Sequence, residues 1–349
     1  MLGTSMPRIV DLSASRLTAQ LLAGEPARSP TAVAERLLAI QGQDLRGARL
    51  AVRARTSGLS VADIDGALAD RSLLITWVNR GTLHLIRSED YPWLHALTAP
   101  TLLTANARRL EQEGVGQAAA ERGVSAIERA LVEHGPQTRD QLREQVAAAA
   151  GEPAGKALLH VLLLASLRGL TVRGPMIGKQ QAHVLVRDWL GEPEPIDRDR
   201  ALAELARRYL AGHGPANDRD LARWAGLPLR DARAGLEAIA PELEQRDDGL
   251  VDLAGRPPAA AQPPPPRLLG PFEPLLLGWT SREPILGDNV SVVTINGIFK
   301  PIALVRGRAV ATWTMPKGQV ELAPFGRLPA SDRKALEGDA ADLTRFLAS

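Results

Sequence analysis

Two similar stretches, EHGPQTRDQL at residues 133–142 and GHGPANDRDL at residues 212–221, decide how the fold is interpreted. In each stretch an apolar helical pattern runs into a His-Gly-Pro break, and a capping residue, Thr138 or Asp218, then opens a second helix. A helix, a tight break and a second helix form the start of a helix-turn-helix unit. The sequence therefore predicts two such units.

The residues that follow each stretch predict a hairpin, or wing. After the first stretch, a helix over 156–168 leads into strands at 170–173 and 183–186, with a turn at Gly174-Pro175. After the second, a helix over 229–239 leads into a short hairpin around Asp247-Asp248-Gly249. Both units therefore have the order helix, helix, helix, wing.

The first 110 residues follow the same order. We expect helices at 32–41 and 61–69, and strands at 73–78 and 82–86. The intervening Asn79-Arg80-Gly81 is typical of a hairpin turn, because Asn and Gly accept positive φ. The prediction is three winged domains in tandem, at residues 1–115, 116–195 and 196–255.

The remainder of the chain has a different composition. A proline-rich linker at 256–270 precedes a C-terminal domain at 271–349. Alternating segments at 290–295, 298–305 and 309–315 predict a β-meander, and 332–347 predicts a closing helix. The expected fold class is α+β, mainly α, with tandem winged helix-turn-helix domains and a β-barrel-like C-terminal domain.

The composition of the 349 residues excludes several kinds of protein. The chain has no cysteine, and its six histidines are scattered, so we expect no disulfide, no metal and no cofactor. No apolar run reaches the length of a membrane span, and an acidic residue lies where a signal peptide needs an apolar core. We therefore expect a cytoplasmic protein.

The balance of charge is less decisive. The net charge is only +2, but almost all of the 42 basic residues are arginines, whose planar guanidinium suits phosphates and base edges. A GC-rich genome produces the same composition, so this feature alone leaves both explanations open. Local basic clusters at 156–188 and 300–317 favour a surface that follows DNA phosphates.

Several segments, taken together, carry a family resemblance. In order they are LLAIQGQD at 37–44, NRGTLHLI at 79–86 followed by Trp93, PFEPLLLG at 271–278, NGIFKP at 296–301 and GRAVATW at 307–313. The chain resembles the AlkZ-type winged-helix DNA glycosylases, which include the YcaQ-like proteins, from about residue 10 to residue 325. The resemblance implies tandem winged-helix domains around a DNA channel, and excision of N-alkylated bases, including the unhooking of interstrand crosslinks.

The resemblance also implies which residues are catalytic. One branch of the family carries Gln-x-Gln, which Gln41-Gly42-Gln43 matches, although Gly42 stands where the family usually has a larger apolar residue. Amides do not transfer protons near neutral pH. A base alkylated at N7 or N3 already carries positive charge, so it leaves as a neutral group and needs only a positioned water and a stabilised oxocarbenium ion. The alternative is a helix C-terminus whose glutamines cap carbonyls, with Gly42 in the left-handed region.

Further residues are candidates for DNA contact. We expect Asp44 to cap the helix that follows the motif. Each candidate has a second interpretation as a solvated surface residue, and His84 as a buried one; the hairpin at 305–309 is a candidate to enter the duplex. The predicted DNA-binding residues are Arg46, Arg49, Arg53, Arg80, Thr82, His84, Lys179, Arg306, Arg308 and Lys317.

The sequence thus predicts a monofunctional DNA glycosylase for N7- or N3-alkylated purines, in which Gln41 and Gln43 position water. We expect no lyase activity, a partner of double-stranded DNA with alkylated or crosslinked bases, and a monomer at the nucleoid. The rival interpretation is a non-catalytic winged-helix DNA-binding protein or transcription regulator, which would typically dimerise and bind a specific sequence.

Overall fold

A helix, a short strand, further helices and a hairpin follow one another twice in the first half of the computed structural model, which describes residues 12–192 and 196–349. The first unit, preceded by α1 (Leu12–Ala19), consists of α2 (Pro30–Leu37), β1 (Ile40–Gln41), α3 (Leu45–Arg53), α4 (Val61–Ala69), β2 (Leu73–Val78) and β3 (Thr82–Arg87). The long helix α5 (Tyr91–Gln112) leads to the second unit. That unit consists of α6 (Gln117–His134), β4 (Gln137–Thr138), α7 (Arg139–Ala150), α8 (Glu152–Lys156), α9 (Leu158–Leu167), β5 (Thr171–Ile177) and β6 (Gln180–Leu185).

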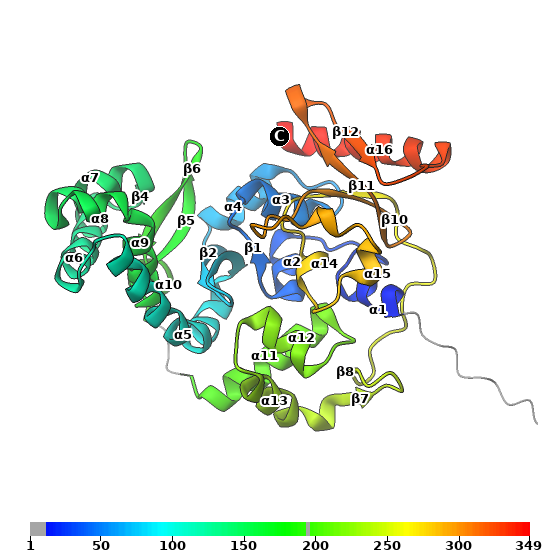
Figure 1. The fold of residues 1–349 in the computed structure, drawn as a ribbon, viewed down its shortest axis with the longest axis horizontal. Helices are drawn as coiled ribbons and strands as arrows, with labels where there is room; N and C mark the ends of the chain where they lie inside the picture. The colour runs from blue at the N-terminus through cyan, green and yellow to red at the C-terminus, as the bar shows by residue number, and fades with distance from the viewer. Residues whose placement is uncertain (1–11, 193–195) are drawn as a thin grey trace, which may run out of the picture.

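The hairpins of these two units form one six-stranded antiparallel sheet. Its strand order is β1-β3-β2-β5-β6-β4, and the two units meet where Ile75 of β2 pairs with Arg173 of β5. In each unit the short strand between the first two helices pairs with the last strand of the hairpin. The second unit extends to the left of the first in Figure 1, and the shared sheet connects them.

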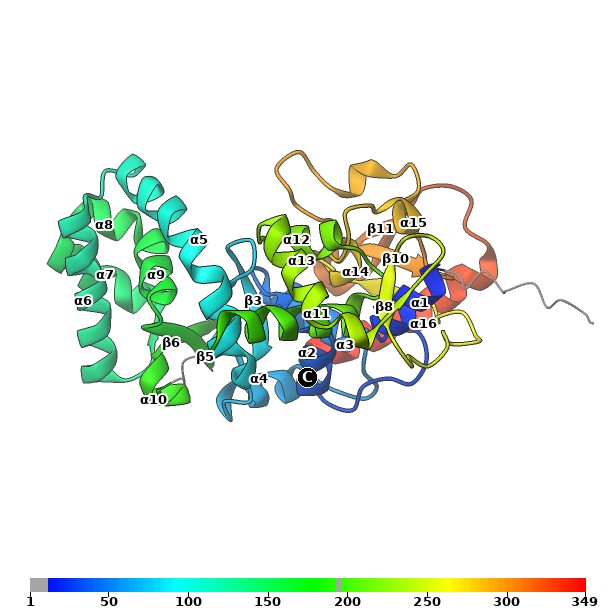
Figure 2. The ribbon, with the colours of Figure 1, turned by 90° about the horizontal axis from the view of Figure 1, so that it is seen from below.

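A third unit has the same order without a regular first strand. After α10 (Val186–Leu190), it contains α11 (Arg198–His213), α12 (Asp218–Ala225), α13 (Leu229–Ala238), β7 (Leu243–Gln245) and β8 (Val251–Leu253). A single bridge from Ala216 to Val251 takes the place of the strand pairing found in the other units. The view in Figure 2 shows α11 beside α2, against which it packs.

Local turn and cap chemistry explains several of these boundaries. Asn79 and Gly81 have positive φ between β2 and β3, as predicted, and Thr138 caps α7. The predicted cap Asp218 is wrong by one residue: the side chain of Asn217 accepts from the Asp220 amide and caps α12. The predicted turn at Gly174-Pro175 is also wrong, because β5 continues through it with a register shift and turns at Gly178.

The C-terminal part is an open sheet covered by a helix. Strands β9 (Arg267–Leu269), β10 (Ile302–Val305), β11 (Arg308–Thr314) and β12 (Glu321–Pro324) pair in the order β12-β11-β10-β9. The first and last strands in this order, β12 and β9, do not pair with each other. The sheet is therefore open, and the predicted barrel is not closed. Two short helices, α14 (Pro274–Leu277) and α15 (Glu283–Leu286), precede β10, and α16 (Ala330–Ala348) packs against β9, α3 and α4.

One predicted strand is absent from this sheet. Residues 290–295 form a 3-10 turn at Val290–Val292 and a loop, which a bridge from Val293 to Phe299 joins to the residues that follow. The fold class is therefore α+β with antiparallel sheets. No helix in the described ranges combines the length and the apolar character needed to cross a bilayer.

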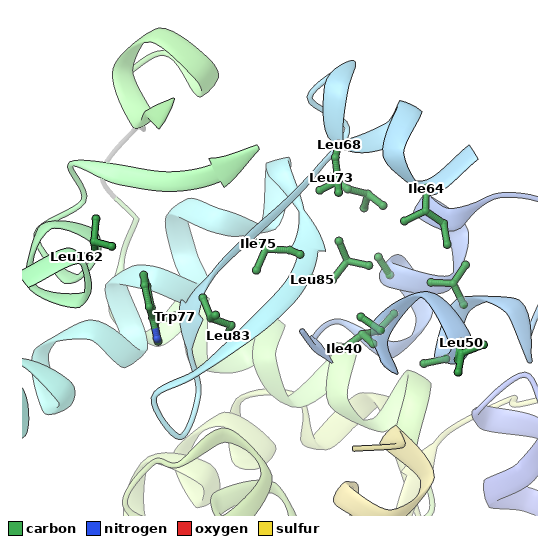
Figure 3. Close-up of a cluster of buried hydrophobic side chains, with 14 of the residues drawn as sticks. Ile40, Leu50, Ile64, Leu68, Leu73, Ile75, Trp77, Leu83, Leu85 and Leu162 are labelled. Atoms are coloured by element: carbon green, nitrogen blue, oxygen red, sulfur yellow. The ribbon is translucent and has the colours of Figure 1, made fainter. Parts of the chain in front are cut away.

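A buried cluster lies on one face of the shared sheet in the first unit. Ile40, Ile75 and Leu85 are side-by-side partners on β1, β2 and β3, and all three are fully buried. Trp77 and Leu83 extend this apolar face, as Figure 3 shows. Because side chains alternate along a strand, the next residues, Gln41, Thr76 and His84, turn to the opposite face.

Candidate active site

The Gln-Gly-Gln motif begins on the edge strand of the shared sheet. Gln41 on β1 is paired with His84 on β3, and His84 with Thr76 on β2, so the three form one row across the sheet. All three are buried, and Thr76 Oγ1 is 3.0 Å from Ser166 Oγ on α9. No side-chain hydrogen bond joins the Gln41 amide to another described residue. Its carbonyl and amino groups are therefore available to water or a ligand.

The backbone of the motif excludes the capping alternative. Helix α2 ends at Leu37, and the left-handed residue is Leu38 with φ of 63°, not Gly42. Gly42 instead donates its amide to the Leu83 carbonyl at 2.7 Å and continues the pairing with β3. A Cβ at Gly42 would lie 3.3 Å from the Leu85 amide nitrogen. The glycine therefore allows the motif to lie close against β3.

The hydrogen bond of His84 assigns its tautomer, and its burial favours the neutral imidazole. Its Nδ1 is 2.8 Å from the Thr82 carbonyl oxygen, which can only accept, so Nδ1 carries the proton and Nε2 is an acceptor. Burial, with a smaller contribution from the nearby Arg80, lowers the pKa of His84 to about 3. At neutral pH the site therefore contains amides and a neutral ring, with no proton donor of the usual acidic kind.

Gln43 and Asp44 occupy the turn between β1 and α3. The Gln43 side chain is exposed and makes no hydrogen bond within the described residues. Asp44 accepts from the Gly47 amide at 3.3 Å and caps α3, which confirms its predicted role. The positive end of α3 and two unpaired amides thus lie at the same edge of the sheet.

The three arginines of α3 have different environments. Arg46 is exposed and directs Nη2 to the sulfur of Met315 at 2.9 Å. Arg49 forms an ion pair with Asp65 of α4. Arg53 is buried, and its guanidinium bonds both carboxylate oxygens of Asp339 at 2.7 and 3.0 Å as well as Asp342. Its charge is thus neutralised inside the protein and is not presented to an external phosphate.

The turn between β2 and β3 brings a second group of predicted residues near the motif. Arg80 is half-buried and donates from Nη1 to the Trp224 carbonyl of α12. The Thr82 hydroxyl is buried and has no hydrogen-bond partner in the part of the chain that the structure describes. Arg80, Thr82 and His84 therefore lie on the hairpin that also pairs with Gln41.

The remaining predicted residues lie farther along the chain on other surfaces. Lys179 is exposed in the turn between β5 and β6, and Lys317 is exposed in the connection between β11 and β12, two residues from the Met315 that contacts Arg46. Arg306 forms an ion pair with Asp332 at 2.8 Å, and Arg308 is exposed. The turn between them packs on α1, because a Cβ at Gly307 would lie 2.5 Å from Leu17.

Sequence reasoning missed two features of the structure. Arg223 on α12 and Arg282 before α15 lie near Arg80 but are 143 and 202 residues from it, and the sequence carried no signal for that proximity. The loop around residues 290–298 exposes Val290, Ile295 and Ile298 by 76%, 106% and 51%. Three exposed aliphatic residues in one loop are a signal of a functional surface. Sequence reasoning missed this signal because it interpreted their alternating pattern as a strand.

Comparison with known proteins places this geometry in context. The family described as DNA glycosylase AlkZ-like matches residues 34–346. The interstrand DNA cross-link repair glycosylase of Streptomyces sahachiroi is 29% identical over 346 residues, covering 92% of each chain. The solved structure of the Streptomyces sahachiroi DNA glycosylase AlkZ superposes with a TM-score of 0.80 at 27% identity, covering 96% of this chain and 95% of that one. These matches confirm the resemblance found in the sequence.

Proposed function

The chain belongs to the AlkZ-like DNA glycosylase family, and on that premise we propose that it hydrolyses the N-glycosidic bond of purines alkylated at N7 or N3 in double-stranded DNA. Crosslinked bases are included because the relative from Streptomyces sahachiroi is named for interstrand crosslink repair. The observation that carries the proposal is the Gln41 amide, which has no side-chain hydrogen bond to another described residue, beside the neutral His84 on the neighbouring strand.

The substrate supplies the chemistry that this site lacks. A purine alkylated at N7 or N3 is cationic, so cleavage of the bond to the sugar carbon releases a neutral base without prior protonation. The protein then has to hold a water beside that carbon and stabilise positive charge on the sugar. The carbonyl oxygens of Gln41 and Gln43 perform both tasks, by accepting from the water and by directing their negative ends to the sugar. An unmodified purine lacks the charge and is a poor substrate.

His84 supports the same step without giving up a proton. Its Nε2 is an acceptor, because Nδ1 donates to the Thr82 carbonyl. It therefore orients the Gln41 amino group or the water, and its low pKa keeps it in that state across the physiological range. Neither glutamine is a nucleophilic amine, so the enzyme is monofunctional and leaves an abasic site without cutting the strand.

The three repeated units are winged-helix modules in this proposal, and exposed cations of the predicted set contact DNA phosphates. Four exposed members of the predicted set form no ion pair within the described residues: Arg46, Lys179, Arg308 and Lys317. The members with internal ion pairs, Arg49, Arg53 and Arg306, hold elements of the protein together. The enzyme acts as a monomer on nucleoid DNA in the cytoplasm, without metal or cofactor. The division at residues 115, 195, 255 and 270 remains our proposal for its domains.

The loop at 290–298 is the segment we assign to enter the duplex, in place of 305–309. The turn at Gly307 is packed on Leu17, whereas Val290, Ile295 and Ile298 are exposed and not packed in the core. Apolar side chains that insert between base pairs unstack them and open the helix. Such a wedge gives access to a bulky or crosslinked base without extruding it into a narrow pocket.

The test is incubation with duplex DNA that contains an N7-alkylguanine, followed by heat or alkali to break the strand at abasic sites. We expect strand breaks at the alkylated base only after the chemical treatment, and none with an unmodified duplex. Breaks before treatment would contradict the monofunctional mechanism. The absence of breaks with every alkylated duplex would refute the enzyme and favour the non-catalytic DNA-binding interpretation.

A further inference from the structure

Three arginines from distant parts of the chain gather at the turn between β2 and β3. Arg80 belongs to that turn, Arg223 to the last turn of α12 in the third unit, and Arg282 to the residue before α15 in the C-terminal part. The cluster therefore joins the first unit, the third unit and the C-terminal part, beside the hairpin that carries His84.

Backbone contacts fix this arrangement. Arg80 donates to the carbonyl of Trp224, the residue after Arg223, and a Cβ at Gly226 would lie only 3.0 Å from the Arg80 Cα. The end of α12 thus lies directly against the turn.

A second set of contacts anchors Arg282 beside the same helix. Thr280 donates its amide and hydroxyl to Asp220 of α12 at 2.9 and 2.7 Å. Asp220 is three residues before Arg223, so the two lie on one side of the helix. Arg282 itself donates from Nε to the Leu276 carbonyl at 2.8 Å and lies over the Phe299 ring. Its Nη groups have no hydrogen-bond partner within the described residues and can bind a ligand.

The charge of the cluster is not balanced from within. None of the three arginines forms an ion pair with a carboxylate in the described part of the chain, although Glu283 is next to Arg282 in sequence. Burial lowers the pKa of Arg80, and Arg223 and Arg282 lower it further, as expected of cations held together. An arrangement of this kind is stabilised when an anion enters it.

Two buried polar side chains at the same turn also lack partners among residues 12–192 and 196–349. Asn79 is 2% exposed, yet neither its Oδ1 nor its Nδ2 has a hydrogen-bond partner there, and the same holds for the buried Thr82 hydroxyl. Buried polar groups in native proteins are nearly always satisfied by protein, water or ligand. The amide nitrogen and the hydroxyl can each donate a hydrogen bond to a phosphate oxygen.

We propose that Arg80, Arg223 and Arg282, with Asn79 and Thr82, form a pocket for one DNA backbone phosphate close to the base that is excised. The assignment rests on the proposed glycosylase function for its substrate. Thr82 is two residues from His84, or about 7 Å along the strand, so the phosphate held there belongs to a nucleotide close to the excised base. The pocket therefore fixes the register of the damaged strand relative to Gln41.

A scan of neutral phosphates tests the pocket. Each duplex carries one methylphosphonate at a different position around an alkylated base, and binding of the full-length protein is measured by fluorescence anisotropy. We expect one position, within about three nucleotides of the base, where the neutral group weakens wild-type binding by about tenfold, as for loss of a charge-assisted contact. In R223Q/R282Q that position becomes insensitive, while the other sensitive positions are unchanged.

The variants are chosen so that misfolding does not imitate the result. Both substitutions leave Arg80 and its contact with Trp224 intact, and equal thermal midpoints check the fold. R223K/R282K keeps the charge and should retain part of the sensitivity. R230Q removes an exposed arginine of α13 and should leave the whole profile unchanged. Loss of sensitivity at two separate positions, or at none, would overturn the single-phosphate pocket. If the wild-type protein binds the duplex but excises no base, the proposed function is refuted. The scan still tests the phosphate pocket in that case, because it measures binding.

Discussion

The substitution E273Q tests how the C-terminal part is held to the unit that carries the motif. Glu273 lies in the PFEP segment and forms a fully buried ion pair with Arg55 at 2.5 Å. Arg55 also donates to the carbonyls of Gln20 and Ala51 and to the Gln20 side chain. A glutamine keeps the shape of the side chain and one acceptor but leaves the arginine charge without a counter-ion.

The magnitude follows from the burial of both partners. Breaking a buried ion pair by removing one charge costs about 3–5 kcal/mol, and the three remaining acceptors around Arg55 place E273Q near the lower end, at about 3 kcal/mol. At roughly 2 °C per kcal/mol for a chain larger than 200 residues, the thermal midpoint should fall by about 6 °C.

The control is the same change at an exposed pair. Glu121 pairs with Arg168 on the surface, where such pairs contribute less than about 1 kcal/mol. Differential scanning calorimetry of E273Q and E121Q gives the comparison directly. If E273Q lowers the midpoint no more than E121Q does, the buried pair does not hold the two parts together as described.

Three further results are expected. R53M should lower stability by about 3 kcal/mol, because the buried Asp339 loses its main partner, yet leave the salt dependence of DNA binding unchanged; a shallower dependence would show that Arg53 contacts phosphate. I295S should slow excision from duplex DNA but not from single strands, without change in the thermal midpoint, and equal slowing on both would argue against the wedge. Burial lowers the pKa of His84 and of His213 to about 3, so the unfolded chain binds protons that the native chain does not. Stability should therefore fall with decreasing pH below about 6.5, by up to ~1.4 kcal/mol per pH unit for each, and urea unfolding with equal midpoints at about pH 7.5 and pH 5 would contradict this.

The sequence predicted the features that local chemistry determines. The turn at Asn79 and Gly81 needs positive φ, which these two residues accept, and the cap Asp44 sits one residue before its helix. Helix α4 has the predicted bounds because its apolar period and its Ser60 cap are both local. Such features depend on a few neighbouring residues, so a single sequence contains them.

The features that the sequence did not predict depend on distant partners. Gln41 was expected at the end of a helix, but pairing with His84 draws it into a strand. Residues 290–295 alternate like a strand, but they form a bridge to Phe299 in the same loop and do not join the four-stranded sheet. Arg53 has the spacing of a surface residue on a basic helix, yet α16, nearly 290 residues later, supplies its carboxylates. The spacing of residues in the sequence shows which of them share a face of a helix. The elements that cover that face depend on the whole fold.

The central claim is that amides, with water and the charge of the substrate, are sufficient to excise the base. The most direct measurement is the single-turnover rate of N7-alkylguanine excision by wild type and by Q41A/Q43A, with duplex affinity and thermal midpoint measured on the same samples. The account predicts that the double variant excises the base at least about 100-fold more slowly than wild type, as for loss of positioned transition-state contacts. Its duplex affinity and thermal midpoint should stay close to wild type. A double variant that binds, folds and excises at the wild-type rate would contradict it.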